Sequence, residues 1–125
     1  MNPKKLVEEF YDLAFNRHEP VEAAEKYLAP EYIQHNPFVA TGSAAFVDAF
    51  RDAFKIEKGR QSRAVFKRTI AEGDLVVLHL HKIRFEGDRG VAGVDIFRVE
   101  DGRITEHWDV NQPVPEESKN ANTMF

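Results

Sequence analysis

The sequence contains no cysteine, so neither a disulfide framework nor thiol chemistry is available to it. It has no apolar run near the ~18 residues that a membrane span needs. The N-terminal residues 1–5 lead into a charged amphipathic segment, unlike a signal peptide. Positive charge is also scarce, with 17 Lys and Arg against 21 Asp and Glu. Because phosphate binding needs a basic surface, the net charge of −4 disfavours nucleic acid as a partner. We therefore expect a cytoplasmic protein with no membrane or nucleic-acid partner.

What the sequence does contain is typical of a soluble globular protein. Hydrophobic residues make up 42% of the chain and charged residues 30%. The 125 residues are enough for a hydrophobic core, and we expect one domain over residues 1–125. The 10 phenylalanines fit an ordinary core and would also suit an aromatic-lined pocket.

The hydrophobic pattern of the first half predicts helices. Apolar residues recur at helical spacing over residues 3–17, a second short helix follows over 20–28, and a third covers 44 to about 57, with Phe54 on its apolar stripe. Between the second and third helices, residues 32–37 are typical of a short strand that a proline ends.

The second half alternates with a period of two residues. Residues 61–71 and 75–86 predict two strands, and residues 91–112 predict a hairpin. Helices followed by an antiparallel meander indicate an α+β fold. We expect the N-terminal helices to pack on a strongly curved, mostly antiparallel sheet, which forms a cone-shaped barrel with an internal pocket.

Polar residues lie inside both strands of the predicted hairpin. Asp95 interrupts the first apolar run, and His107 and Asp109 interrupt the second. Carboxylates are rarely buried without a partner. Acids in the middle of strands therefore suggest the wall of a cavity.

The length of the hairpin loop decides which groups meet. A two-residue loop, residues 101–102, places Asp95 opposite Trp108, whereas a three-residue loop, residues 100–102, places Asp95 opposite His107. We favour the longer loop because it gathers Asp95, His107 and Asp109 on one face. That register leaves one apolar face, formed by Ile104, Trp108 and Val110.

His79 and His81 share one face of the strand predicted over residues 75–86. With Gly73, Glu86 and Gly93 they match the spacing of the first cupin motif, and His107 with Asn111 resembles the end of the second. Two such histidines and a carboxylate can bind a transition metal. The proline and glycine expected before the last histidine are missing, and a helical first half does not fit a β-barrel. We therefore expect no metal.

Six short segments match the order and spacing of a known family over almost the whole chain. They are Tyr32–Pro37, Ile70–Asp74, His79–His81, Asp95–Arg98, Glu100–Ile104 and Glu106–Val110. The chain resembles the nuclear transport factor 2-like superfamily and, within it, the SnoaL-like polyketide cyclases. That resemblance implies a late-strand aspartate acting as general base in an aldol cyclisation, and Asp109 matches it. Those cyclases carry a histidine on the preceding strand, where this sequence has Asp95.

The ketosteroid isomerases, another branch of the superfamily, are similar at different positions. Their oxyanion hole is a tyrosine on the first helix and a protonated aspartate, which Tyr11 and Asp95 match. Their base is an aspartate directly before a proline, where this chain has Asn36. An asparagine cannot accept the proton, so His35 or Asp109 would have to do so.

The two resemblances together imply a cofactor-independent enzyme that acts on a small hydrophobic or carbonyl-containing ligand through an enolate. Asp95, kept neutral by burial, and Tyr11 would donate hydrogen bonds to the enolate, and Asp109 or His35 would remove the proton. The remaining predicted substrate contacts are Asn36, Phe54, His79, His81, His107 and Trp108.

Two other interpretations stay open at the level of sequence. Asp95, His107 and His79 would form a closed polar network that only fixes the sheet. Alternatively, the domain would bind a ligand or dimerise without catalysis. We expect a homodimer in either case, formed through an outer sheet face that carries Leu78, Leu80 and Trp108.

Overall fold

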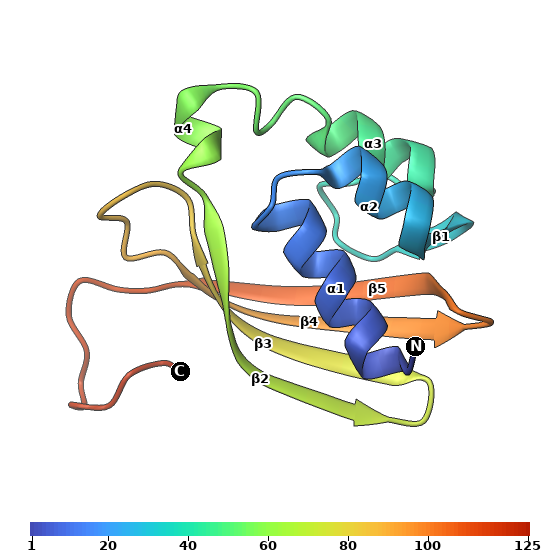
Figure 1. The fold of residues 1–125 in the computed structure, drawn as a ribbon. Coiled ribbons are helices and arrows are strands. Elements are labelled where there is room, and N and C mark those ends of the chain that lie inside the picture. The colour runs from blue at the N-terminus through green and yellow to red at the C-terminus, as the bar shows by residue number, and fades with distance from the viewer.

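Helices occupy the first half of the chain and most of the strands the second, in a computed structural model that describes residues 1–125 (Figure 1). The helices are α1 (Pro3–Phe15), α2 (Pro20–Tyr27), α3 (Ser43–Phe50) and α4 (Glu57–Arg60). The strands are β1 (Leu28–Gln34), β2 (Arg63–Glu72), β3 (Leu75–Ile83), β4 (Val91–Glu100) and β5 (Arg103–Pro113).

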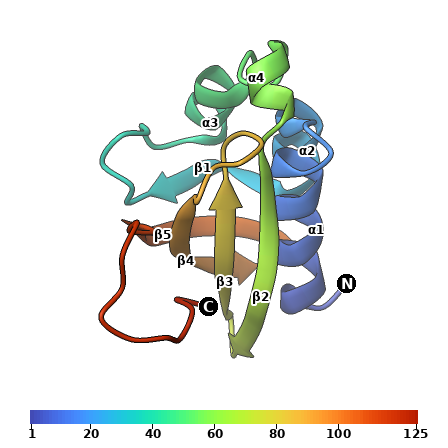
Figure 2. The same ribbon diagram turned by 90° about the vertical axis from the view of Figure 1, so that its left-hand side faces the viewer.

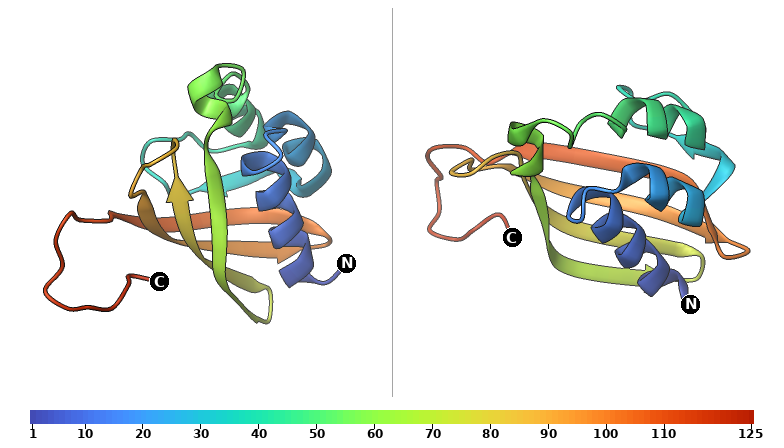
Figure 3. Two further views of the ribbon diagram at one scale, coloured as in Figure 1. Left: turned by 60° about the vertical axis from the view of Figure 1, so that its left-hand side comes forward. Right: turned by 45° about the horizontal axis from the view of Figure 1, so that its top comes forward.

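The five strands form one sheet in the order β1-β5-β4-β3-β2. β1 runs parallel to β5, and the other neighbours are antiparallel. The sheet curls around α1 without closing, and the helices lie on its inner side (Figures 2 and 3). We call the covered side the concave face and the other side the convex face. The predicted α+β class, with helices on a strongly curved and mostly antiparallel sheet, is confirmed.

The helix ends differ from the sequence prediction mainly in the third helix. α1 begins where Asn2 Oδ1 accepts a hydrogen bond from the Lys5 backbone N–H at 2.8 Å, as an N-cap does. α3 stops at Phe50, several residues before the predicted end. The chain then folds back so tightly that a Cβ on Gly59 would lie 1.8 Å from the Ala53 carbonyl oxygen. None of the helices has the length and apolar character that a membrane crossing requires.

The hydrophobic core fills the space between α1 and the concave face. On β3, the side chains of Val76, Leu78 and Leu80 are fully buried there. Because neighbouring residues of a strand point to opposite faces, the odd-numbered side chains of β3 lie on the convex face. The prediction that Leu78 and Leu80 lie on an outer, subunit-pairing face is therefore wrong.

The β4–β5 hairpin turns through two residues, Asp101 and Gly102, whose φ angles are 50° and 74°. Two consecutive left-handed residues are typical of a type I′ turn. Glu100 pairs with Arg103 across it. The predicted three-residue loop is therefore wrong, because the shorter turn satisfies the twist of the strands.

A bulge follows directly after this turn and returns the later side chains of β5 to the faces of the sheet that we predicted for them. Val99 pairs with Ile104 but Arg98 pairs with Glu106, so Thr105 is the extra residue. Asp95 consequently lies opposite Asp109, and the predicted pairing of Asp95 with His107 is wrong. Because the observed register differs from the predicted one by two residues, Asp95, His107 and Asp109 still lie on the concave face.

The same bulge divides the apolar face that we expected on β5. Ile104, before the bulge, is fully buried in the core. Trp108 and Val110, after it, lie on the convex face, and Val110 is 75% exposed. The prediction of one apolar face through all three residues is wrong, because an inserted residue reverses the alternation of the side chains.

Asn16, at the end of α1, joins the helical layer to β2. Its amide donates to the Ala64 carbonyl at 3.0 Å and accepts from the Ala64 N–H at 2.7 Å. We expect Asn16→Ala to lower the free energy of unfolding by about 1–3 kcal/mol, because it leaves two part-buried backbone groups of Ala64 without partners. Urea unfolding measures this change. Asn120→Ala, in the exposed C-terminal tail, is the matched control and should change the free energy by less than about 0.5 kcal/mol. Equal stability of the two variants would contradict the proposed role of Asn16.

Candidate active site

A cavity of about 880 Å³ lies between the helices and the concave face. It is lined by 25 residues, of which 14 are hydrophobic, which is typical of a small-molecule site. Six of the residues predicted from sequence line it, namely Tyr11, Asn36, Phe54, Asp95, His107 and Asp109. Four do not, namely His35, His79, His81 and Trp108.

Asp95 is the most deeply buried acid of the cavity, at 2% exposed. Its Oδ1 lies 2.8 Å from His107 Nε2, and its Oδ2 lies 2.9 Å from Lys82 Nζ, although that ammonium is not aligned for a hydrogen bond. Burial acts to raise the pKa of Asp95. The hydrogen bond with His107 and the charge of Lys82 outweigh burial and hold the pKa below its ordinary value. Asp95 is therefore an ionised acceptor, and the prediction that it is a neutral donor is wrong.

The hydrogen bonds of His107 fix the orientation of its ring. Gln34 Oε1 accepts from the Asn36 backbone N–H at 3.0 Å, which determines the orientation of the Gln34 amide. The same oxygen lies 2.7 Å from His107 Nδ1, so this ring nitrogen must donate to it. Nε2 lies 2.8 Å from Asp95 Oδ1. Both ring nitrogens of His107 are therefore engaged by protein partners.

Lys82 is a cavity residue that sequence reasoning missed. It lies on β3, on the same face as Leu80, and its side chain passes over Gly93 of β4. A Cβ on Gly93 would lie 2.5 Å from Lys82 Cε. The ammonium also donates to Asn111 Oδ1 at 2.8 Å. A glycine in the middle of a strand marks a close approach, and Gly93 was the signal that could have revealed this lysine.

Asp109 lies opposite Asp95, with its side chain 9% exposed. The Asn36 amide donates to both of its carboxylate oxygens, at 2.9 and 3.0 Å. Asp109 Oδ2 is 3.9 Å from His107 Nε2. Each carboxylate oxygen has two lone pairs, so Asp109 can still accept a proton from a ligand in the cavity. Asn36 is therefore a residue that positions Asp109.

Two tyrosines add hydroxyl groups to the cavity. Burial raises the pKa of Tyr11 well above its ordinary value, and the nearby Asp95 and Asp109 raise it further. Burial likewise raises the pKa of Tyr32, whose hydroxyl accepts a hydrogen bond from Gln34 Nε2 at 3.2 Å. Tyr11 makes no hydrogen bond within the protein. Its protonated hydroxyl is therefore free to donate to a ligand.

His35 and Trp108 lie together on the other side of the sheet. Their rings stack with centroids 5.0 Å apart, and His35 Nε2 lies 2.7 Å from Glu106 Oε2. That hydrogen bond lowers the pKa of Glu106. The expectation that His35 and Trp108 contact a ligand in the pocket is wrong, because Trp108 follows the β5 bulge on the convex face.

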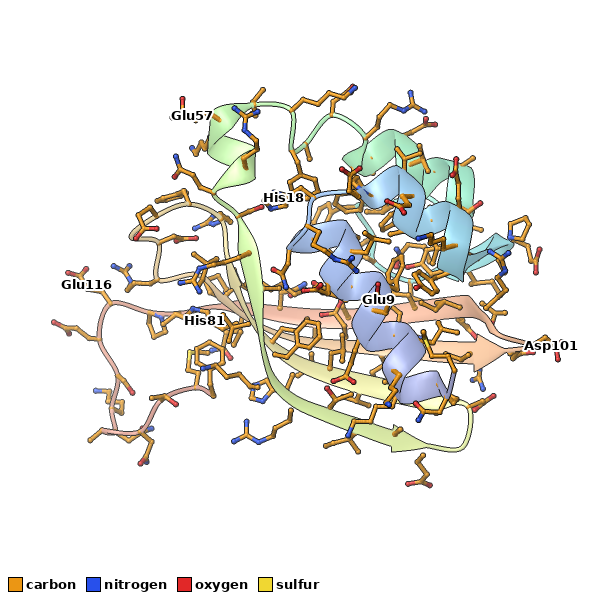
Figure 4. The ribbon with its side chains drawn as sticks, in the orientation of Figure 1. Glu9, His18, Glu57, His81, Asp101 and Glu116 are labelled. Carbon is orange, nitrogen blue, oxygen red and sulfur yellow. The ribbon has the colours of Figure 1, made fainter.

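His79 and His81 also occupy the convex face, where the C-terminal tail returns to the sheet (Figure 4). Arg68 donates to His79 Nδ1 at 2.9 Å, and His81 Nε2 lies 2.8 Å from the Arg89 carbonyl. The expected place of both residues in the pocket is wrong, because the odd-numbered side chains of β3 point outward. The predicted network of Asp95, His107 and His79 is wrong for the same reason. His79 and His81, the two histidines of the cupin-like motif, therefore lie on the opposite face of the sheet from His107 and cannot share a metal ion with it.

Asp95, His107 and Asp109 present possible metal-binding atoms within 4.8 Å of one another. However, both nitrogens of the His107 ring are engaged in hydrogen bonds with Gln34 and Asp95, so neither is free to bind a metal ion. The Lys82 ammonium already faces Asp95. The donor set therefore suits organic acid–base chemistry better than metal binding.

The depressed pKa of Asp95 predicts a loss of stability in acid. Because the folded-state pKa lies below the unfolded value of about 3.9, ionised Asp95 stabilises the fold above that pH. This stabilisation is lost as the pH falls through the folded pKa. We expect Asp95→Asn to lower the free energy of unfolding by about 3 kcal/mol at pH 7, since it breaks a buried ion pair. Below about pH 4 the difference from wild type should shrink.

Urea unfolding at a series of pH values measures this difference. Asp101→Asn, in the exposed hairpin turn, is the matched control and should track wild type throughout. A difference between wild type and Asp95→Asn that stays constant from pH 7 to pH 2 would contradict the ion-pair account.

The chain was compared with known families and structures. The model of the SnoaL-like domain matches residues 7–107. TsrD from Streptomyces laurentii has 26% identity and a TM-score of 0.65, over 86% of this chain and 85% of that chain. None of the curated proteins matches.

Two further structures share the fold at lower identity. IdmH from Streptomyces antibioticus, a polyketide cyclase candidate, has 20% identity and a TM-score of 0.67, over 89% of this chain and 92% of that chain. A ketosteroid isomerase candidate from Kribbella flavida has 17% identity and a TM-score of 0.72, over 94% and 83%. The resemblance carried by the sequence motifs is confirmed, and this chain belongs to the SnoaL-like domain family.

Proposed function

We propose that the protein is a cofactor-independent enzyme that removes an α-proton from a carbonyl substrate and stabilises the enolate that forms. The observation that carries this proposal is the Asp109 carboxylate, which lines an apolar cavity together with the Tyr11 hydroxyl, a donor without a partner in the protein. A base and a hydrogen-bond donor held together in an apolar cavity are what enolate chemistry requires.

Asp109 is the base in this proposal. It matches the late-strand aspartate that the resemblance to the SnoaL-like cyclases implies, and it lines the cavity whereas His35 does not. The Asn36 amide holds both carboxylate oxygens and fixes the direction in which Asp109 points. A general base positioned in this way contributes about 10²–10⁴-fold to a rate.

The Tyr11 hydroxyl alone takes the stabilising role that we first assigned to Tyr11 together with a neutral Asp95. As Asp109 takes the α-proton, the electron pair of the C–H bond moves to the carbonyl oxygen, which accepts a hydrogen bond from Tyr11. The enolate carbon then attacks the carbon of a second carbonyl group, and the π electrons of that carbonyl move to its oxygen as the carbon–carbon bond forms. The resulting alkoxide takes the proton back from Asp109, as in an aldol closure. Alternatively, Asp109 returns the proton to another carbon, as in an isomerisation.

Isomerisation of a small β,γ-unsaturated ketone tests the role of Asp109. With cyclohex-3-enone, transfer of a proton from the α to the γ carbon gives the conjugated enone, whose ultraviolet absorbance measures the rate. We expect Asp109→Asn to lower kcat/KM at least about 100-fold, because an amide cannot accept the proton. Asp101→Asn, in the hairpin turn outside the cavity, should retain the wild-type rate.

Two outcomes of that assay would contradict the proposal. One is a wild-type rate equal to that of buffer, which favours the alternative of a binding module without catalysis. The other is full activity of Asp109→Asn, which would exclude Asp109 as the base.

We also propose that a second copy of this chain pairs with the convex face. An apolar row crosses four strands there in register, and it comprises Ile70, Val77, Ile96 and Trp108. Ile70 is 60% exposed, and Val110 beside the row is 75% exposed. Exposed apolar side chains in one continuous patch favour association between subunits. We propose this row as the dimer face in place of the face predicted from sequence, which contained Leu78 and Leu80.

A charge placed in this patch should prevent pairing. We expect the wild-type protein to be a dimer by light scattering at micromolar concentration and Val110→Asp to be a monomer, since the partner copy would have to bury an unpaired carboxylate. Ile56→Asp is the matched control, because Ile56 is also exposed, at 62%, but lies next to α4, and this variant should remain a dimer. A wild-type monomer would exclude the proposed dimer.

A further inference from the structure

The charge lining the cavity is opposite in sign to the charge of the whole protein. The chain has a formal net charge of −4. The cavity, however, is lined by three Lys and Arg side chains, Arg63, Lys82 and Arg84, against two carboxylates, Asp95 and Asp109. A cavity that is more positive than its surroundings attracts an anionic ligand.

These cations differ in how far they are neutralised. Arg84 forms two hydrogen bonds with Asp88, at 2.9 and 3.1 Å, so its charge is balanced. Arg63, at the exposed start of β2, makes no ion pair. Lys82 donates one of its three N–H groups to Asn111 and forms an ion pair with Asp95 without a hydrogen bond. Lys82 therefore keeps at least one donor for a ligand, and Arg63 keeps all of its donors.

The position of Lys82 relative to the proposed base limits what the ligand can be. The ammonium is held by Asn111, which follows Asp109 by two residues on the same face of β5. Two residues along a strand span roughly 7 Å. An anionic group on Lys82 would therefore lie a few bonds from a C–H group that faces Asp109.

We propose that Lys82, assisted by Arg63, binds a carboxylate group of the substrate, and that the substrate is a hydrophobic keto acid. This inference rests on the proposed function for the keto group, but the carboxylate site depends only on the cations. The apolar part of the ligand contacts the aromatic wall of the cavity, which includes Phe10, Phe46, Phe50 and Phe54. Lys82 thus determines specificity, whereas Asp109 performs the chemistry.

A matched pair of ligands tests the site without any turnover. The ligands 1-naphthylacetate and 1-naphthylacetamide have nearly the same shape and differ in charge, and titration of the naphthalene fluorescence gives their Kd values. We expect the wild-type protein to bind the acid at least about tenfold more tightly than the amide at pH 7 and low salt. The reason is that the hydrogen bond from the Lys82 ammonium to the ligand carboxylate joins two charged groups, whereas the amide is neutral. This preference should fall as the ionic strength rises.

Variants separate Lys82 from the other cations. Lys82→Met should remove the preference, Lys82→Arg should keep most of it, and Arg63→Gln should reduce it about two- to threefold. Arg63 is exposed at the first position of β2, so its variant tests the site even if Lys82→Met does not fold. Lys67→Met is the matched control, because Lys67 lies over Phe125 on the convex face, and it should retain the wild-type preference.

The outcomes distinguish this inference from the proposed function. Equal binding of acid and amide by the wild-type protein, or a full preference in both Lys82→Met and Arg63→Gln, would overturn the carboxylate site. Asp109→Asn should keep or increase the preference for the acid, since it removes a negative charge from the cavity. A carboxylate preference in a protein that shows no isomerisation would leave the anion site standing and refute only the proposed catalysis.

Discussion

Asp95 is a carboxylate buried in the middle of a β-sheet, and the arrangement of the cavity depends on how its charge is compensated. An isolated carboxylate in such a place would take up a proton, since burial raises its pKa. Here His107 and Lys82 each approach one of its oxygens within 3 Å. The need to compensate this buried carboxylate explains why the His107 ring points at Asp95 and why Lys82 extends into the cavity.

Local backbone features make this group possible. Gly93 leaves the space through which Lys82 reaches Asp95, because any larger side chain there would overlap with it. The bulge at Thr105 reverses the alternation of β5, so that His107 and Asp109 face the cavity although Ile104 also faces inward. The backbone N–H of Asn36 orients Gln34, and Gln34 orients His107. The polar groups are thus positioned by backbone atoms of several strands and are not free to rearrange independently.

The polar groups of the cavity divide into two roles. Asp95, Gln34 and Asn36 are held by protein partners and orient their neighbours. Asp109 and Tyr11 retain hydrogen-bonding capacity that faces the cavity. A site in which some groups are fixed and others are free is preorganised for a reaction, because the free groups need no rearrangement to meet the substrate. The apolar remainder of the wall strengthens each of these interactions, because it lowers the local dielectric constant.

The sequence by itself determined the α+β class, most helix and strand positions, the family resemblance, and the gathering of Asp95, His107 and Asp109. These follow from hydrophobic periodicity and from motifs that are local in the chain. A cytoplasmic location stays a prediction from composition. Only the tertiary structure decided that Asp95 is ionised, that Lys82 lines the cavity, and that His35, His79, His81 and Trp108 lie outside it. The reason is that one inserted residue, or one glycine on a neighbouring strand, changes which side chains meet, and neither effect is visible in the pattern of a single strand.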